Sequence, residues 1–169
     1  MKITDIYING VEDSIGYACD DLVCSWKVID TVSRKQTYAK IEVSKTEDFE
    51  DVIFMREGKN LKSNGECLEF VPEPRTVYYL RISVTGDKND SAVSDTYCFE
   101  TGKMQESWNG EWIAAQKQDM FHPKFRKKIS VTKAVKSARL YISGVGLFEA
   151  YWDGKKLGDE YLTPYLTNY

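Results

Sequence analysis

Hydrophobic and polar residues alternate along much of the chain. The alternation is most regular at residues 22–28, 39–43 and 78–84, where apolar side chains occupy every second position. Because successive side chains of a strand point to opposite faces, each run offers one apolar face to a core and one polar face to solvent. No run repeats apolar residues at helical spacing, although residues 46–51 could begin one helical turn capped by Thr46. The pattern predicts an all-β protein of antiparallel strands.

Turn-forming residues separate these runs. They occur at Asn9-Gly10, residues 58–60, Asn64-Gly65, residues 86–90, Asn109-Gly110 and Asp153-Gly154. Short strands with turns at this spacing are typical of β-sandwiches. The alternation stops near Gly102, and the polar residues 103–107 follow it. We therefore expect two domains, at residues 1–102 and 103–169.

The first domain has the features of a fibronectin type III or immunoglobulin-like sandwich. Trp26 is expected on the inward face of an early strand, and Pro74, Thr76 and Tyr78 form a P-x-T-x-Y pattern before a late one. This pattern resembles a tyrosine corner, in which a tyrosine hydroxyl bonds to backbone a few residues upstream. The alternative interpretation of Tyr78 is an ordinary core tyrosine.

The second domain continues the strand pattern. Strands are expected at residues 124–131, 138–142 and 147–152, with a reversal at residues 144–146. Asp153-Gly154 suits a type I′ hairpin turn. Only four or five candidate strands follow Trp112, whereas a jelly-roll sandwich uses about eight. We therefore expect an incomplete, partial jelly-roll-like β-sandwich, whose open sheet edge can pair with a second copy of the chain.

Composition and charge exclude several classes of partner. The 169 residues are 42% hydrophobic, and 26 acidic and 23 basic residues are spread along the chain, giving a net charge of −3. A nucleic-acid partner would require a cationic footprint, and the basic run at residues 124–128 reads as a solvated strand face. No apolar segment is long enough for a membrane span. The first residues lack an apolar signal-peptide region, so a cytoplasmic location is expected.

The four cysteines do not indicate a metal or a disulfide framework. Cys19, Cys24, Cys67 and Cys98 form no C-x-x-C pair, so neither a zinc site nor a disulfide scaffold is predicted. Reduced, partly buried thiols are the simplest interpretation.

No catalytic motif is present in the sequence. His122 is followed by Pro123 and is read as a surface or strand-end residue. The segment 144–146 begins like a dinucleotide-binding loop but lacks the third glycine and the following helix. Glu149 and Asp153 are interpreted as strand-surface and turn residues, because sequence alone identifies no glycosidase carboxylate pair. We predict no catalytic residue, no metal and no cofactor.

Aromatic side chains are the remaining candidates for binding. They make up 13% of the residues, and exposed rings can stack on the apolar faces of sugars. Trp108, Trp112 and Trp152 are the three to consider. The alternative is packing in the sandwich core or between domains, which the high average burial of tryptophan favours.

Longer stretches resemble a known enzyme family. The C-terminal stretch "SARLYISGVGLFEAYWDGKKLGDEYLTPYLTNY" is similar to the opening of the N-terminal sandwich domain of bacterial α-L-rhamnosidases. Upstream, "YCFETG", "WNGEWIAAQ" and "FRKKISV" are similar to the family's link from a fibronectin-like domain into that sandwich. The resemblance is strongest from Phe99 onward and weaker before Thr76. Leu80, Asp153 and residues 55–58 depart from the family pattern, all in strands or turns.

The resemblance implies a parent glycoside hydrolase that removes terminal α-L-rhamnose by inversion. Its acid and base carboxylates would lie on an (α/α)₆ barrel that this sequence does not contain. The chain would then be a non-catalytic N-terminal accessory segment, inactive by itself, whose partner is the remainder of the parent chain. The alternative is a stand-alone carbohydrate-binding or protein-interaction module, with rhamnose-containing glycans as candidate ligands.

Overall fold

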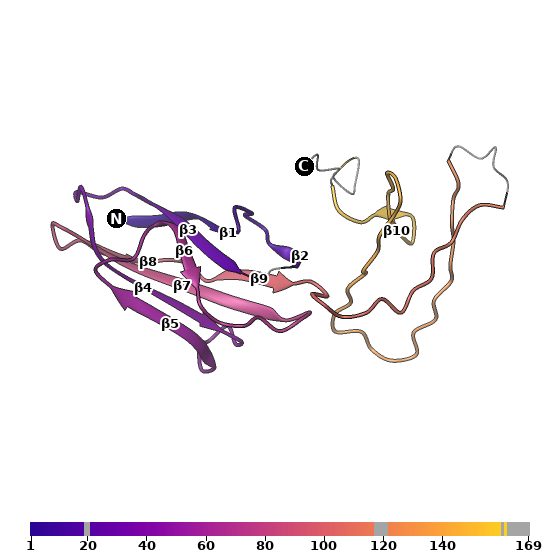
Figure 1. Ribbon diagram of the computed structural model, residues 1–169, viewed down its shortest axis with the longest axis horizontal. Helices are drawn as coiled ribbons and strands as arrows, with labels where there is room; N and C mark the ends of the chain where they lie inside the picture. The colour runs from indigo at the N-terminus through magenta and orange to yellow at the C-terminus, as the bar shows by residue number, and fades with distance from the viewer. Residues whose placement is uncertain (19–20, 117–121, 160, 162–169) are drawn as a thin grey trace. The chain divides into compact units, whose positions relative to one another are not determined.

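The computed structural model describes residues 1–18, 21–116, 122–159 and 161 (Figure 1). The chain divides into two compact units, Met1–Ile113 and Ala114–Tyr169, and each is treated by itself below. Strands are the regular elements of the described ranges, and no helix there is long and apolar enough to cross a membrane.

The first unit is a sandwich of two β-sheets (Figure 1). A three-stranded sheet has the order β1-β3-β6, and a six-stranded sheet has the order β2-β9-β7-β4-β5 with β8 also paired to β7. This arrangement confirms the predicted immunoglobulin-like sandwich. Its strands are β1 (Lys2–Ile8), β2 (Ile15–Tyr17), β3 (Leu22–Ile29), β4 (Gln36–Ser44), β5 (Val52–Gly58), β6 (Asn64–Leu68), β7 (Val77–Gly86), β8 (Ser91–Val93) and β9 (Tyr97–Thr101).

The alternating residues build the core between the two sheets. Every second residue of β7 is buried, and the inward residues of β4 are fully buried as well. Trp26 on β3 is 4% exposed, as its position in the pattern predicts. Each strand thus places its apolar face against the opposite sheet, which removes that face from water. The core consists of Ile3, Ile8, Leu22, Cys24, Trp26, Ala39, Ile41, Val43, Leu68, Tyr78, Leu80, Ile82, Val84 and Phe99.

The sheet edge at β2 depends on a close backbone approach. β2 pairs with β9 in parallel, opposite to the antiparallel pairing of the other strands of the unit. The N–H of Gly102 donates to the carbonyl of Tyr17 at 2.8 Å. A Cβ added to Gly102 would lie 2.2 Å from the carbonyl oxygen of Gly16. Only glycine therefore allows β2 to lie this close to the end of β9.

Strands β8 and β9 both pair with β7, one after the other along its length, and together act as one interrupted strand. The break falls at Ser94, which is 8% exposed. The Ser94 N–H donates to the carbonyl of Ile82 at 2.8 Å, and the Ile82 N–H donates to the Ser94 hydroxyl at 3.0 Å. The serine side chain thus supplies the acceptor that the regular ladder would have provided.

Turns form at some of the expected sites, such as Asn9-Gly10 and Asp153-Gly154. The prediction is wrong at Asn64-Gly65, which begin strand β6 because they pair with β3, and no turn forms at Asn109-Gly110. Asp153 and Gly154 have φ values of 46° and 80°, which are the positive angles of a type I′ turn. At residues 46–51 the chain forms a hydrogen-bonded turn, with Phe49 at a φ of 60°. The Thr46 hydroxyl accepts from the Asp51 N–H at 3.2 Å. Thr46 therefore closes a loop, and the helical turn expected there does not form because Phe49 leaves the helical region.

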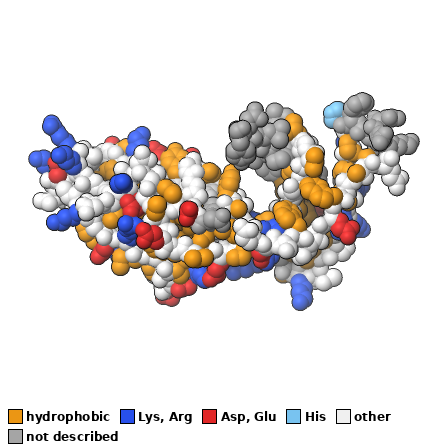
Figure 2. Space-filling view, viewed as in Figure 1, with side chains coloured by type: hydrophobic (Ala, Val, Ile, Leu, Met, Phe, Trp, Pro, Cys, Tyr) orange, Lys and Arg blue, Asp and Glu red, His pale blue; other side chains and the backbone are white. Residues whose placement is uncertain are grey.

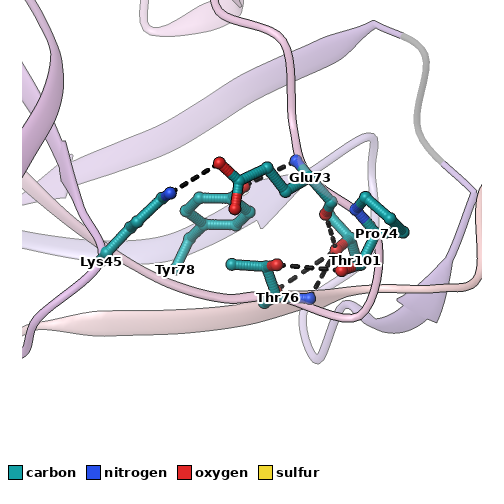
Figure 3. A network of polar contacts seen from close by, with 6 residues as sticks. All are labelled: Lys45, Glu73, Pro74, Thr76, Tyr78 and Thr101. Atoms are coloured by element: carbon teal, nitrogen blue, oxygen red, sulfur yellow. Dashed lines mark hydrogen bonds and ion pairs between the residues drawn. The ribbon is translucent and has the colours of Figure 1, made fainter.

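A tyrosine corner locks the connection between β6 and β7 (Figure 3). The Glu73 N–H donates to the hydroxyl of Tyr78 at 2.7 Å, which confirms the predicted role of Tyr78. The Tyr78 ring is fully buried and stacks on Phe99 with 5.3 Å between centroids. The Thr101 hydroxyl donates to the carbonyl of Glu73 at 2.6 Å and accepts from the Thr76 N–H at 3.0 Å. The loop is therefore tied both to the core and to the end of β9.

The second unit contains far less regular structure than its sequence pattern predicts. Within residues 122–159 the structure has only the hairpin of β10 (Tyr151–Trp152) and β11 (Lys155–Lys156). The strands expected at residues 124–131 and 138–142 are not formed, and that prediction is wrong for this structure. A strand needs a neighbouring strand, and no strand among the described residues pairs with these segments. Their apolar side chains stay 49–59% exposed, as at Phe125, Leu140 and Ile142.

Candidate functional site

The segment that follows β9 is held against the tyrosine-corner loop. The Arg75 N–H donates to the carbonyl of Gly102 at 2.8 Å, and the Arg75 guanidinium donates to the Glu106 carboxylate at 2.7 Å. The Glu106 N–H donates to the Lys103 carbonyl at 2.9 Å, and the Lys103 ammonium lies 3.9 Å from the Glu106 carboxylate. These contacts extend the order of the sandwich beyond its last strand to residue 106.

Trp108 is an exposed aromatic residue two positions after Glu106. Its side chain is 55% exposed, and the Lys103 ammonium lies 5.4 Å from the centroid of its ring. A cation at this distance favours one position of the indole through attraction to its π-electrons. Trp112, in the same unit, is 74% exposed. An exposed ring with a neighbouring ammonium and carboxylate can contact a sugar through stacking and hydrogen bonds.

The hairpin of the second unit carries a second group of aromatic and charged residues. The Glu149 carboxylate accepts from the Tyr151 hydroxyl at 2.7 Å and pairs with the Lys156 ammonium at 3.1 Å. These two partners, the hydroxyl first, lower the pKa of Glu149, and the same hydrogen bond raises the pKa of Tyr151. The Lys156 ammonium also lies 4.0 Å from the ring centroid of Tyr161. Glu149 is therefore an ionised hairpin residue, consistent with its interpretation as a strand-surface carboxylate.

A shallow hollow of about 350 Å³ lies beside this hairpin. Its apolar part is formed by Ala138, Leu140, Ile142, Phe148, Ala150 and Leu157, and its polar part by Arg139, Glu149 and Lys156. Many hydrophobic side chains lie on the surface of this unit (Figure 2). The hollow therefore joins exposed apolar surface to the polar residues of the hairpin.

The tryptophan candidates from the sequence are all exposed. Trp108, Trp112 and Trp152 are 55%, 74% and 55% exposed, so none is a core residue of its own unit and that interpretation is wrong. Packing against another domain stays a prediction. Trp108 contacts Lys103 in the first unit, whereas Trp152 belongs to the hairpin of the second unit.

The other residues considered in the sequence analysis form no catalytic or metal-binding arrangement among the described residues. His122 is exposed, and the segment 144–146 forms a turn. Residues 124–128 are exposed and solvated, although not as a strand face. Among the described residues no cluster of three or more histidine, cysteine or acidic side chains could hold a metal ion.

The cysteines divide into one buried and two exposed thiols, and Cys19 lies outside the described residues. Burial, with a smaller contribution from the charge of Glu66, raises the pKa of Cys24 to about 12. Since the thiolate is the reactive form, Cys24 is an inert core residue. Cys67 and Cys98 are the exposed pair.

Sequence reasoning missed the residues that position Trp108. Arg75 and Glu106 are 31 positions apart, and the Arg75 N–H reaches the carbonyl of Gly102 across a similar gap. Neither pair shows periodicity or motif spacing. Only the polar character of residues 103–107 is visible in the sequence, and its lack of alternation predicts a domain boundary.

Two protein-family models match the chain in tandem. The first, described as the Rha78A-like N-terminal immunoglobulin domain, matches residues 3–105. The second, described as the alpha-L-rhamnosidase N-terminal domain, matches residues 133–169. An α-L-rhamnosidase of Formosa agariphila is 28% identical over 161 aligned positions, and the match covers 79% of this chain and 16% of the relative. The chain therefore spans a small part of the length of the curated relative that it matches.

Solved structures show the same fold. The α-L-rhamnosidase of Streptomyces avermitilis, solved in complex with L-rhamnose, aligns at a TM-score of 0.57 and 20% identity over 68% of this chain and 12% of that one. An α-L-rhamnosidase from Dictyoglumus thermophilum aligns at a TM-score of 0.55 and 24% identity, over 63% and 13% of the two chains. Because the first family match covers more than half of the 169 residues, the chain belongs to the Rha78A-like N-terminal immunoglobulin domain family and corresponds to the N-terminal region of α-L-rhamnosidases.

Proposed function

We propose that this chain is a non-catalytic accessory region of an enzyme that hydrolyses terminal α-L-rhamnosides. The observation that carries the proposal is the order of the two matched domains, the immunoglobulin domain at 3–105 and the rhamnosidase N-terminal domain at 133–169. The reaction needs an acid and a base carboxylate held on opposite sides of the bound sugar. These carboxylates belong to a catalytic domain outside the present sequence, and the chain packs against that domain or shapes the approach of substrate.

Activity assays of two proteins test this proposal. The present chain should release no aryl alcohol from an aryl α-L-rhamnoside, whereas the protein encoded by the complete reading frame should release it and invert the anomeric configuration. Turnover by the purified chain itself would contradict the non-catalytic role. A complete protein that cleaves other glycosides but not rhamnosides would contradict the substrate.

A second candidate function is direct sugar binding through the exposed tryptophans. It is favoured by Trp108, whose 55% exposed ring lies beside the Lys103 ammonium, which in turn lies 3.9 Å from the Glu106 carboxylate. Calorimetric titration with L-rhamnose should then show saturable heat that is lost in Trp108→Ala and kept in Trp152→Ala. Saturable heat lost only in Trp152→Ala would move the site to the hairpin. If the wild-type chain gives no saturable heat, the sugar-binding function is contradicted and packing against the catalytic domain is favoured.

Self-association is a property that we propose for the second unit. Its apolar residues at alternating positions, such as Phe125, Ile129 and Val131, are 55–58% exposed, and unpaired segments of this pattern pair readily with other strands. Light scattering over a concentration series should show dimers or larger species. A monomer at every concentration, for the wild-type chain, would contradict this proposal.

A further inference from the structure

The chain contains three Asn-Gly sequences, at residues 9–10, 64–65 and 109–110. In such a pair the backbone nitrogen of glycine can attack the side-chain carbonyl of asparagine, because glycine has no Cβ to hinder the approach. The attack needs a glycine N–H that is not held in a hydrogen bond and an asparagine side chain that is free to rotate. The three sites differ in both requirements.

At Asn9 the side chain is fixed at both ends. Its amide nitrogen donates to the Asp21 carbonyl at 3.0 Å, and its oxygen accepts from the Val23 N–H at 2.7 Å. The backbone N–H of Asn9 also donates to the Val23 carbonyl at 2.8 Å. Rotation of the Asn9 side chain toward Gly10 would break two hydrogen bonds that join the turn to β3, so the sandwich opposes it.

At Asn64 the attacking nitrogen is occupied. The Gly65 N–H donates to the Ser25 hydroxyl at 3.0 Å, and Asn64 itself lies opposite Ser25 in the β3–β6 ladder. Cyclisation there would remove Gly65 from this hydrogen bond and bend the first residues of β6. The pairing of the sheet therefore protects this site as well.

Asn109 and Gly110 carry neither form of protection. Both residues are exposed and lie outside any strand. No hydrogen bond of the Asn109 side chain or of the Gly110 N–H occurs among the described residues. The pair also lies beyond Glu106, the last anchored residue of the segment.

We propose that Asn109 is a deamidation site of this protein, selected from the three Asn-Gly sequences by the fold. The Gly110 nitrogen forms a bond to the Asn109 side-chain carbon and ammonia leaves, which gives a five-membered succinimide. Water then opens either carbonyl of the ring, giving aspartate or isoaspartate. The net change is replacement of an amide by a carboxylate, without an oxidant or a cofactor. It places a negative charge next to Trp108 and, in isoaspartate, adds a methylene to the backbone.

Peptide mapping of the whole native chain tests this proposal. After incubation at mildly alkaline pH, the peptide containing residue 109 should gain the mass of amide-to-acid conversion several-fold faster than the peptides containing residues 9 and 64. Isoaspartyl methyltransferase should label the same peptide. Equal or faster conversion at Asn9 or Asn64 in the native chain would overturn the proposal.

Two controls separate the effect of the fold from that of local sequence. In urea the three peptides should convert at similar rates, because the protecting hydrogen bonds are gone; a lead for Asn109 that is unchanged in urea would overturn selection by the fold. Asn109→Gln should abolish labelling of that peptide, because the longer side chain forms a six-membered ring less readily. Since residue 109 lies outside the sandwich hydrogen bonds, this variant should keep the wild-type unfolding midpoint. Total labelling that stays at the wild-type level in this variant would also contradict the assignment.

Discussion

At the scale of single residues, buried polar groups in this protein act by holding loops and strands to the core. Tyr78 accepts one backbone hydrogen bond from Glu73 while its ring packs between Phe99 and Phe70. Its hydroxyl thus connects the loop to the centre of the sandwich. A phenylalanine would keep the packing and lose only this connection.

Tyr78→Phe should therefore lower the free energy of unfolding by about 1 to 2 kcal/mol, the cost of leaving one part-buried donor without its acceptor. Urea denaturation followed by fluorescence measures it. Tyr79→Phe is the matched control, because Tyr79 lies on the outward face of β7 and is only partly buried. The control should change stability by less than about 0.5 kcal/mol; equal losses in both variants would argue against the tyrosine corner as a stabilising contact.

Glu42 is the carboxylate whose ionisation the fold supports most directly. Its side chain is 12% exposed and contacts Arg81 at 3.1 Å and Lys40 at 2.8 Å. Burial by itself raises the pKa of Glu42, but the hydrogen bonds and charges of Lys40 and Arg81 outweigh burial and hold it below its ordinary value of 4.5. A lowered pKa contributes stability above the unfolded-state value, and that stability is lost as the pH falls through the folded-state value.

Glu42→Gln should lower the free energy of unfolding by about 1 to 2 kcal/mol at neutral pH, where the charged hydrogen bonds are lost. The difference from wild type should shrink as the pH falls below 4.5. Urea midpoints across an acid pH series measure this, with Glu47→Gln as control because Glu47 is exposed. A difference that stays constant with pH would contradict the role of the ionised carboxylate. The pKa values of Asp87 and Asp90 are also lowered, but both residues are present in the wild type and in the variant. Their contributions therefore cancel in the difference between the two unfolding free energies.

At the scale of elements, the sandwich tolerates interruptions where a side chain replaces the missing ladder contact. The break between β8 and β9 leaves the Ile82 N–H opposite Ser94, whose hydroxyl accepts it at 3.0 Å inside the protein. The close approach of Gly102 to β2 serves the same side of the sheet, where β2 pairs with β9. The Ser94 hydrogen bond and the close approach of Gly102 allow the short strands β8, β9 and β2 to complete the six-stranded sheet.

Ser94→Ala should lower the free energy of unfolding by about 1 to 3 kcal/mol, because it leaves the buried Ile82 N–H without an acceptor. Thermal unfolding monitored by circular dichroism measures the change. Ser91→Ala on β8 is the matched control, since Ser91 is exposed and should be nearly neutral. An unchanged midpoint for Ser94→Ala would mean that water replaces the hydroxyl at the break.

At the scale of the whole molecule, the two units differ in how completely their apolar residues are buried. The sandwich buries a continuous core from both sheets, whereas the second unit leaves residues such as Trp152 and Val145 at 55% and 93% exposed. Stability that depends on buried area and paired backbone should therefore be concentrated in the first unit.

Hydrogen exchange of the intact chain should separate the two units. Amides of β7, which lies between β4 on one side and β8 and β9 on the other, should be protected by the global free energy of unfolding. Amides of residues 124–131 should exchange at rates near those of an unstructured chain. Protection that appears at 124–131 only at high protein concentration would indicate pairing between copies. Protection there at every concentration would contradict this prediction.

The sequence by itself determined the first unit well. Period-two alternation placed Trp26 and the inward residues of β4 and β7 in the core, because a strand has no other way to bury every second side chain. The P-x-T-x-Y pattern located Tyr78, since both ends of its hydrogen bond lie within a few residues. The Asp153-Gly154 turn was equally local. Longer motifs also identified the enzyme family.

Only the tertiary structure decided which alternating segments become strands and which aromatic rings are exposed. Residues 124–131 alternate as regularly as β4, yet no neighbour pairs with them in the described part of the second unit. Pairing is a property of two segments, and one segment's pattern does not contain it. The contacts that position Trp108 were also not visible in the sequence. Arg75 binds Glu106 across 31 positions, and Lys103 lies in a polar stretch that shows no alternation. These contacts arise because the tyrosine corner brings the β6–β7 loop to the end of β9.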